Sequence, residues 1–250
     1  MSLSKFEAVL CDLGGVLYVG ETPIKGAVEA VQAIKRNYPI RFITNTTQKR
    51  SEQVSASLRK MGFDIHSHEI ITALDVTKRY LQEQRSSAYY LLTDEAESYF
   101  DDISFENIGF VVVGDAQDNF SYKRLNTAFR HLQRGARLIA AAKNRYFKDS
   151  DNILSMDAGG FVQALEYASD TRAKVIGKPS EEFYRLACSA IGFRPADCIM
   201  IGDDIESDVG GAKEAGLQSV LVKTGKFRAE DLNKGIQPDI VLDSIRDFMP

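Results

Sequence analysis

An apolar run near the start of the chain ends in a lone carboxylate, and this feature restricts the possible folds most. Residues 6–10 are too few for a helix of their own and indicate a short buried strand. Asp12 then lies at the carboxyl end of that strand, where open α/β sheets hold their ligands. Gly14 and Gly15 follow, and glycine allows the backbone to turn tightly and to approach a bound group. Taken alone, the segment also fits an ordinary turn-forming or helix-capping aspartate, so its role depends on the residues further along the chain.

Short apolar runs alternate with helical patterns over the rest of the chain. The runs that indicate strands are residues 40–43, 70–71, 88–92, 110–113, 137–141, 175–176, 198–201 and 219–222. The segments between them carry apolar residues at helical spacing, as in residues 26–36. Strands that alternate with helices imply a parallel sheet, so we expect an α/β protein. Residues 1–79 and 171–250 are expected to form one core domain, and residues 80–170 a second α/β unit.

The composition argues against several classes of protein. The chain of 250 residues is 44% hydrophobic and 26% charged, which is typical of a globular protein. A formal net charge of -4 gives no electrostatic reason to expect nucleic acid or an anionic membrane surface as a partner. No apolar run approaches the roughly 20 residues that a membrane helix needs. Cys11, Cys188 and Cys198 are widely spaced in apolar segments, which indicates buried thiols in a reducing compartment, so we expect a cytoplasmic protein.

Four polar residues of reactive type each follow a predicted strand: Asp12, Thr44, Lys178 and Asp203. The carboxyl ends of parallel strands meet at one edge of a sheet, so these side chains are expected to lie together. Each has an ordinary structural explanation when it is considered alone. Thr44 fits a turn, Lys178 fits a solvated loop, and Asp203 with Asp204 fits the start of a helix. Their common place at one edge favours a functional site.

The same residues lie within four segments that form an ordered pattern: Asp12 with Gly15–Leu17, Thr44–Asn45, Gly177–Pro179, and Gly202–Asp204 with Asp208. This pattern resembles the four motifs of the haloacid dehalogenase superfamily. The chain length and the insert between the second and third motifs resemble the NagD-type branch, whose members carry a large cap. The resemblance extends over nearly the whole chain. It implies a Rossmann-like parallel-sheet core with an inserted α/β cap domain.

Further segments refine the resemblance: Asp118–Tyr122, Ala164–Ala168, Lys178–Ser180 and Lys223–Arg228. They look like the corresponding parts of the phospholysine phosphohistidine inorganic pyrophosphate phosphatases and of the haloacid-dehalogenase-like hydrolase domain-containing proteins.

The resemblance implies a Mg²⁺-dependent phosphohydrolase that forms an aspartyl-phosphate. In the family pattern Asp12 attacks phosphorus and also binds the metal, together with the backbone carbonyl of Gly14 and the carboxylate of Asp203. Asp208 completes the metal site by orienting a water molecule, and Asp204 assists it. A hard cation such as Mg²⁺ suits these oxygen ligands, and it screens the repulsion between a carboxylate and a phosphate.

The resemblance also implies how the substrate is held. Thr44 and the backbone of Asn45 hydrogen-bond the transferred oxygens, and Lys178 neutralises them as a catalytic and substrate-binding cation. The expected partners are small-molecule phosphates or phosphorylated side chains, with no nucleic acid and no membrane. The resemblance further favours a homodimer.

Two charged regions lie outside the four motifs. In the middle of the chain one group either lines the substrate side of the cap or forms a solvated loop, and both interpretations remain open: Lys143, Arg145, Lys148 and Asp157. Residues 225–235, which include Lys226, are expected to form a surface loop.

The chain departs from the usual phosphatase pattern at one position. That pattern has a second aspartate two residues after the nucleophile, which protonates the leaving group and then activates water. Gly14 occupies this position and can do neither, although its backbone carbonyl remains available to a metal. General acid–base catalysis contributes about 10²- to 10⁴-fold, so alkyl phosphate esters are expected to react slowly. Phosphoramidates and pyrophosphate are expected to be preferred substrates. The leaving group of pyrophosphate is phosphate, whose second pKa is roughly 6, so it needs little protonation.

Two alternatives to this interpretation exist. Phosphonatases and dehalogenases do not need the second aspartate in this form, but a phosphonatase needs a Schiff-base lysine in its cap. A dehalogenase would have little use for Asp203 and Asp208. The other alternative is a protein of the same fold that binds metal and phosphate but catalyses weakly or not at all.

Overall fold

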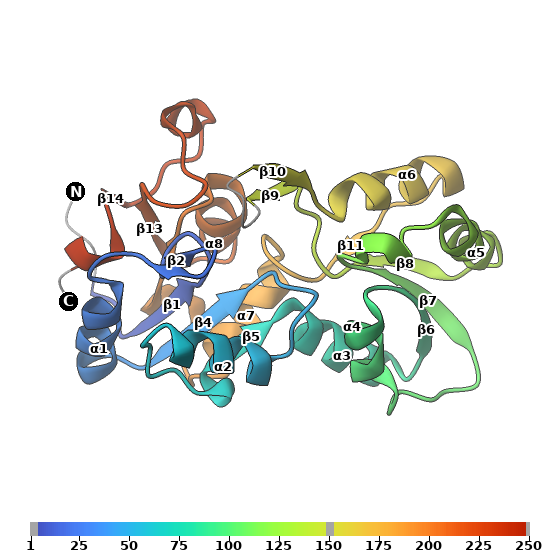
Figure 1. Cartoon of the computed structure of the whole chain (residues 1–250), viewed down its shortest axis with the longest axis horizontal. Coiled ribbons are helices and arrows are strands. Elements are labelled where there is room, and N and C mark those ends of the chain that lie inside the picture. The colour runs from blue at the N-terminus through green and yellow to red at the C-terminus, as the bar shows by residue number, and fades with distance from the viewer. Residues whose placement is uncertain (1–4, 149–152, 249–250) are drawn as a thin grey trace. The chain divides into compact units, whose positions relative to one another are not determined.

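The computed structural model describes residues 5–148 and 153–248, and its chain forms two compact units (Figure 1). The first unit comprises Met1–Thr44, Glu52–Ile71 and Lys178–Pro250, and the second comprises Asn45–Ser51 and Thr72–Gly177. The domain limits expected from the sequence, between residues 79 and 80 and between residues 170 and 171, stay a prediction. Helix α3 (Ala73–Gln84) runs through the first of these limits.

The first unit is built on a six-stranded sheet with the order β14-β13-β12-β1-β4-β5. Its strands are β1 (Ala8–Asp12), β4 (Ile40–Thr44), β5 (Ile70–Thr72), β12 (Cys198–Gly202), β13 (Gln218–Val222) and β14 (Ile240–Leu242). Strand β1 lies inside the sheet and pairs in parallel with β12 on one side and β4 on the other. All five of its residues are buried, which explains why its sequence is a continuous apolar run up to the terminal carboxylate.

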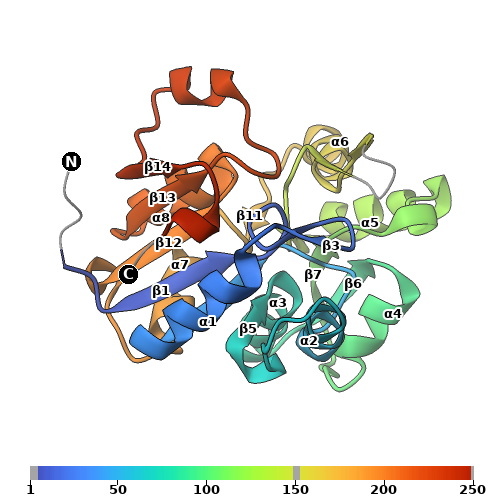
Figure 2. The same ribbon diagram turned by 60° about the vertical axis from the view of Figure 1, so that its left-hand side comes forward.

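Helices cover this sheet. They are α1 (Ala27–Asn37), α2 (Ser51–Lys60), α7 (Glu181–Ser189), α8 (Gly211–Glu214) and a π-helix (Ile205–Gly210). Figure 2 shows α1 lying along β1. Val31 and Ile34 of α1 are buried in one hydrophobic core with Val9 of β1 and Phe42 of β4, as their helical spacing predicts. A short hairpin, β2 (Tyr18–Val19) and β3 (Thr22–Pro23), follows the Asp12 turn.

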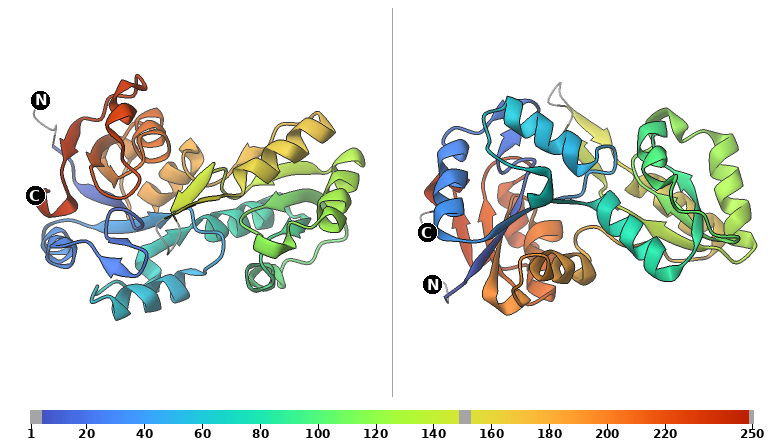
Figure 3. Two further views of the ribbon diagram at one scale, coloured as in Figure 1. Left: turned by 45° about the horizontal axis from the view of Figure 1, so that its top comes forward. Right: turned by 90° about the horizontal axis from the view of Figure 1, so that it is seen from below.

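The second unit contains its own four-stranded parallel sheet with the order β11-β8-β7-β6. Its strands are β6 (Ser87–Leu91), β7 (Ile108–Val113), β8 (Arg137–Ala140) and β11 (Lys174–Val175). Its remaining elements are α3, α4 (Asp94–Glu97), α5 (Tyr122–Gln133), α6 (Gly159–Ser169) and the antiparallel hairpin of β9 (Tyr146–Lys148) and β10 (Leu154–Met156). Figure 3 shows this unit from two further sides. Apolar residues of α5 and α6 share one core with β7 and β8.

The α/β class, the parallel core sheet and the separate second α/β unit are confirmed. The two hairpins were not predicted, because Gly20 and Pro23 are typical of a loop and the strands β9 and β10 contain no continuous apolar run. The strand predicted at residues 175–176 exists as β11, but it belongs to the second unit's sheet and not to the core sheet. The three cysteines are buried free thiols, as predicted.

Within residues 5–148 and 153–248, no helix combines the length and the apolar composition that crossing a bilayer requires.

Candidate active site

Two neighbouring parallel strands bring Asp12 and Asp203 together. Asp12 is the last residue of β1, and Asp203 directly follows β12. The register aligns Cys11 with Ile201, which places Asp12 opposite Gly202, the residue before Asp203. A carboxylate oxygen of Asp12 and one of Asp203 lie within 4.8 Å of each other. Both side chains are buried, with 8% of Asp12 and 2% of Asp203 exposed. Thr44 ends β4 on the other side of β1, so the structure brings three of the predicted residues to one sheet edge.

A π-helix places Asp208 against the turn that follows β12. The Oδ2 atom of Asp208 accepts hydrogen bonds from the backbone N–H groups of Asp203, at 3.2 Å, and of Asp204, at 3.1 Å. Gly202 permits this approach, because a Cβ atom there would lie 2.2 Å from the Cβ of Asp208. A regular helix was expected here, and the wider π-turn is a frequent feature of functional sites.

Asp204 has the capping role that was considered for both aspartates. Its Oδ1 atom accepts hydrogen bonds from two backbone N–H groups of the π-helix, each at 3.0 Å. Burial opposes ionisation of Asp204, but the nearby Lys226 ammonium and these N–H groups outweigh it and lower the pKa of this carboxyl. Asp203 has no such capping contact among those described, so its carboxylate is available for another role.

Lys178 bridges the carboxylates of Asp12 and Asp208. Its Nζ atom donates to Oδ1 of Asp12 and to Oδ1 of Asp208, each at 2.6 Å, and only 4% of its side chain is exposed. Burial favours the neutral amine, but the two carboxylates outweigh it and raise the pKa of Lys178 above its ordinary value. The expectation that Lys178 ends a strand of the core sheet is wrong. The chain leaves β11 in the second unit and returns to the first unit at this residue.

The acidic side chains of the site are suited to a divalent cation. Asp12, Asp203 and Asp208 each offer a carboxylate oxygen, and these three oxygens lie within 4.8 Å of one another. Burial, together with the charges of Asp12 and Asp208, raises the pKa of Asp203. Burial likewise raises the pKa of Asp208 to about 6, although Lys178 opposes the shift. Crowded buried carboxylates of this kind fit a hard cation such as Mg²⁺, which binds oxygen ligands.

Replacing Asp203 with asparagine is expected to stabilise the metal-free protein. Folding raises the pKa of the Asp203 carboxyl, so the folded state binds a proton more readily than the unfolded state does. The contribution of this group to the free energy of unfolding therefore falls as the pH rises above the ordinary value of 3.8. At pH 7 without a divalent cation, Asp203→Asn should therefore raise the free energy of unfolding, by on the order of 1 kcal/mol. The difference should vanish as the pH is lowered toward 3.8, where the folded wild-type carboxyl is protonated.

Thermal unfolding in EDTA at the two pH values measures this effect. Addition of Mg²⁺ at pH 7 should reverse the order of the two proteins, because a cation that binds only the folded wild type stabilises it by mass action. An asparagine variant that is less stable than the wild type in EDTA at pH 7 would contradict the prediction.

Gly14 and Asn45 occupy different surroundings. Gly14 is exposed, and a Cβ atom placed on it would meet no atom within 4 Å. Asn45 belongs to the second unit, where its Nδ2 atom donates to Oδ1 of Asn144 at 3.3 Å. Contact of Thr44 and Asn45 with a phosphate stays a prediction, as does metal binding by the Gly14 carbonyl.

A loop that was not predicted to be functional contacts the acidic residues. The backbone N–H of Lys226 donates to Oδ2 of Asp203 at 2.6 Å, and its Nζ atom lies 3.7 Å from Oδ2 of Asp204. Residues 225–235 were expected to form a surface loop, and the structure adds that Lys226 of this loop contacts the acidic residues. Two signals were available: residues 223–228 follow a predicted strand, β13, which pairs with β12, and they belong to a segment that resembles the family.

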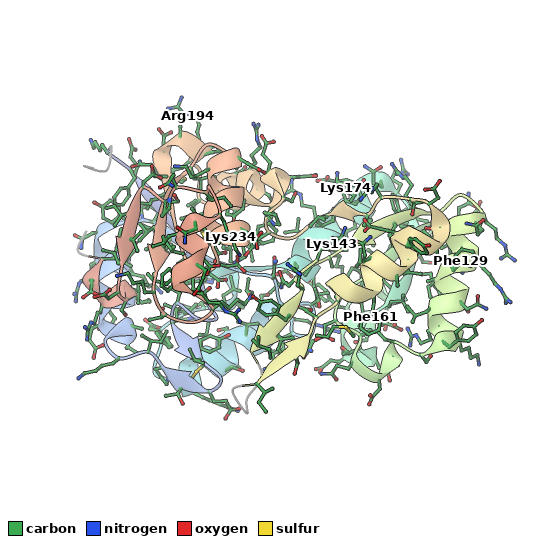
Figure 4. The ribbon with its side chains drawn as sticks, turned by 90° about the horizontal axis from the view of Figure 1, so that it is seen from above. Phe129, Lys143, Phe161, Lys174, Arg194 and Lys234 are labelled. Atoms are coloured by element: carbon green, nitrogen blue, oxygen red, sulfur yellow. The ribbon has the colours of Figure 1, made fainter. Side chains whose placement is uncertain are left out.

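Two residues of the charged group in the middle of the chain, Lys143 and Asp157, have contacts within the second unit. Lys143, which follows β8 and is labelled in Figure 4, donates to both carboxylate oxygens of the buried Glu166 on α6 at 2.8 Å. Asp157 is buried and accepts a hydrogen bond from the backbone N–H of Ala158 at 2.6 Å. The side chain of Lys148 lies outside the described part of the chain. Lys143 therefore forms an ion pair within the second unit, and a role of this group in substrate binding stays a prediction.

Comparisons with known proteins agree with this geometry. The family described as haloacid dehalogenase-like hydrolase matches residues 9–106, and a second described as HAD-hydrolase-like matches residues 175–248. The human haloacid dehalogenase-like hydrolase domain-containing protein 2 is 42% identical over 91% of this chain and 88% of its own. The phospholysine phosphohistidine inorganic pyrophosphate phosphatase of Rattus norvegicus is 42% identical over 92% of this chain and 87% of its own.

Solved structures show the same architecture. The p-nitrophenyl phosphatase from Archaeoglobus fulgidus superimposes with a TM-score of 0.89 at 26% identity, over 98% of both chains. NagD from E. coli superimposes with a TM-score of 0.87 at 22% identity, over 98% of this chain and 99% of its own, which shows the shared fold. The chain belongs to the haloacid dehalogenase-like hydrolases and is a phosphatase of that family with a NagD-like fold.

Proposed function

We propose that the protein is a Mg²⁺-dependent phosphohydrolase that works through an aspartyl-phosphate on Asp12 and favours P–N and pyrophosphate bonds. The observation that supports this most is the arrangement around Asp12. Its carboxylate is held by the buried ammonium of Lys178 at 2.6 Å and lies beside the acidic side chains of Asp203 and Asp208. A carboxylate nucleophile, a fixed cation and a set of oxygen ligands for a metal are the parts that phosphoryl transfer requires.

The chain's own residues supply most of the proposed steps. A carboxylate oxygen of Asp12 forms a bond to phosphorus while the bond from phosphorus to the leaving group breaks. Water then attacks the same phosphorus atom, so phosphate leaves and the Asp12 carboxylate is regenerated. Lys178 orients the Asp12 carboxylate, and it neutralises charge on the transferred group. When bound, Mg²⁺ supplies the positive charge that lets the two anions approach each other. Its proposed ligands are Asp12, Asp203 and the Gly14 carbonyl, with Asp208 supporting them.

The preference for particular bonds rests on Gly14. No side chain at this position can protonate a leaving oxygen. Phosphate released from pyrophosphate has a second pKa of roughly 6 and leaves without such help, and the nitrogen of a phosphoramidate can carry its own proton. The relative from Rattus norvegicus is named for phospholysine, phosphohistidine and pyrophosphate, which agrees with this proposal.

Phosphate release from four substrates tests the function. Wild-type enzyme with Mg²⁺ would be assayed on pyrophosphate, a phosphoramidate, an aryl phosphate and glycerol phosphate. Turnover of the first three well above the last is the expected result. Equal turnover of glycerol phosphate and pyrophosphate would contradict the bond preference but not the phosphatase chemistry. Binding of metal and phosphate without any turnover would favour the weakly catalytic alternative.

Replacing Gly14 with aspartate should raise the rate on alkyl esters. The substitution fits sterically, because a Cβ atom at this position meets no neighbour within 4 Å and the φ angle of Gly14 is not positive. A new acid–base group is worth about 10²- to 10⁴-fold when it is well placed, so a gain of at least tenfold in kcat/KM on glycerol phosphate is expected.

The matched control is Gly14→Asn, which has the same shape but no acid. It should leave the rate on glycerol phosphate near the wild-type value. If the aspartate variant gains no more than the asparagine variant, another residue already supplies the proton and the argument from Gly14 is wrong.

The cytoplasmic location, the homodimer and the choice between small phosphates and phosphorylated side chains stay predictions from the sequence.

A further inference from the structure

The segment Thr224–Lys226, which follows β13, contacts the turn after Asp12 and the carboxylate of Asp203. The Oγ1 atom of Thr224 donates to the carbonyl oxygen of Gly15 at 2.5 Å. Two residues further on, the N–H of Lys226 donates to Oδ2 of Asp203 at 2.6 Å. The loop therefore connects two parts of the candidate metal site that come from β1 and β12.

Gly225 allows the loop to come this close. A Cβ atom on Gly225 would lie 2.1 Å from Oδ2 of Asp203 and 2.4 Å from the Cα of Gly15. Gly15 is restricted in the same way, since its own Cβ would lie 2.0 Å from Oδ2 of Asp203. Both glycines also have positive φ angles, of 63° and 83°, which side chains rarely adopt. Three chain segments therefore meet at one oxygen atom of Asp203.

The side chain of Lys226 also affects the charge of the site. Four carboxylates lie close together there, those of Asp12, Asp203, Asp204 and Asp208, and two ammonium groups accompany them, those of Lys178 and Lys226. When all four carboxylates are ionised, four negative and two positive charges sum to -2, which one divalent cation neutralises. Without Lys226 the same cluster would carry -3.

We infer that Thr224–Lys226 is a positioning loop for the metal site. The Lys226 N–H holds Oδ2 of Asp203 and so fixes the orientation of this carboxylate beside Asp12 and Asp208. Thr224 fixes the turn that carries the Gly14 carbonyl. Lys226 and Thr224 touch neither the substrate nor the metal in this arrangement, and they act through Asp203 and the Gly14–Gly15 turn. The inference rests on the cation site of the proposed function. It adds Thr224–Lys226, as a fifth segment, to the four motif segments that form the site.

Binding of Mn²⁺, measured by the loss of the free-ion electron paramagnetic resonance signal, tests the inference without relying on activity. Thr224→Val removes the hydroxyl donor at nearly constant shape. Because groups that orient metal ligands typically contribute 10- to 100-fold to affinity, its Kd for Mn²⁺ should rise by at least about tenfold. Thr224→Ser retains the hydroxyl and should bind Mn²⁺ within about twofold of the wild type.

Two further variants separate the loop's backbone from general effects. Thr77→Val removes a buried hydroxyl-to-carbonyl hydrogen bond of 2.7 Å in helix α3 of the second unit, so it should leave the Kd unchanged. Lys226→Met keeps the backbone N–H but removes a positive charge beside the acidic cluster. It should bind Mn²⁺ as tightly as the wild type or about threefold more tightly, which is opposite in sign to Thr224→Val.

The outcomes distinguish the inference from the proposed function. If the wild type binds Mn²⁺ and Asp203→Asn does not, the cation site exists. In that case, an unchanged Kd for Mn²⁺ in Thr224→Val would overturn the positioning role of the loop and leave the proposed function intact. An equal loss in Thr77→Val would also overturn it, because the effect would not be specific to the loop. If the wild type does not bind Mn²⁺, the cation site of the proposed function is wrong and the inference fails with it.

Discussion

The Asp12→Asn enzyme is expected to release phosphate from pyrophosphate or an aryl phosphate at least about 10⁴-fold more slowly than the wild type. Asparagine has the shape of aspartate, but its amide oxygen carries no charge and is a poor nucleophile. The variant also loses the ion pair of 2.6 Å to Lys178, which keeps the carboxylate oriented. Steady-state phosphate release measures the rate, and an acid quench of wild type with labelled substrate should trap radioactivity on the protein.

The control for this variant is Asp243→Asn. Asp243 is exposed and pairs with Lys223 at 2.9 Å, so the same chemical change there should leave the rate within about twofold. Retention of a tenth or more of the activity in Asp12→Asn would show that another group attacks phosphorus. Loss of activity with no label on the wild-type protein would favour direct attack by water instead.

Replacing Lys178 with methionine is expected to lower both stability and activity. The change leaves the carboxylates of Asp12 and Asp208 buried without their common partner. Breaking a buried ion pair by removing one partner costs roughly 3–5 kcal/mol, so the free energy of unfolding at pH 7 in EDTA should fall by about that amount. The deficit should shrink as the pH is lowered toward 4, because protonation neutralises the unpaired carboxylates. Loss of an electrostatic stabiliser should also reduce kcat by about 10²- to 10³-fold.

Lys223→Met provides the matched comparison. Its ammonium pairs with Asp243 at a similar distance, but 45% of its side chain and 77% of that of Asp243 are exposed. Exposed ion pairs contribute little to stability because solvent screens them, so urea unfolding in EDTA should hardly distinguish this variant from wild type. If the two lysine variants lose the same stability, Lys178 is not the electrostatic centre of the site.

The sequence was sufficient for most of the site because parallel sheets obey a simple rule. An apolar run that ends in a polar residue identifies the carboxyl end of a buried strand, and such ends lie at one edge of the sheet. Asp12, Thr44 and Asp203 follow this rule, and the structure brings them to one edge through adjacent strands. The family could be recognised from the order of its motifs, because the chemistry restricts the residue types at those strand ends.

Lys178 shows where this rule is not enough. It follows an apolar pair of residues, so it was expected at the end of a core strand, but that strand belongs to the sheet of the second unit. Strand patterns report burial and not the sheet to which a strand belongs. Its burial between two carboxylates was likewise invisible in the sequence, because burial of a charge depends on partners that are 166 and 30 residues away.

The contacts of Lys226 and Asp208 with other segments could not be predicted from the sequence either. The segment of Lys226 has the glycine and basic residues of an ordinary surface loop, and only the pairing of β13 with β12 brings its N–H to Asp203. Asp208 was identified through the family resemblance, but its two hydrogen bonds from backbone N–H groups depend on the π-helix. The sequence by itself determined the α/β class, the family and the chemical identity of the acidic residues, since these depend on local burial patterns and residue types. Only the tertiary structure decided which groups surround each carboxylate, because those contacts join segments that no local pattern connects.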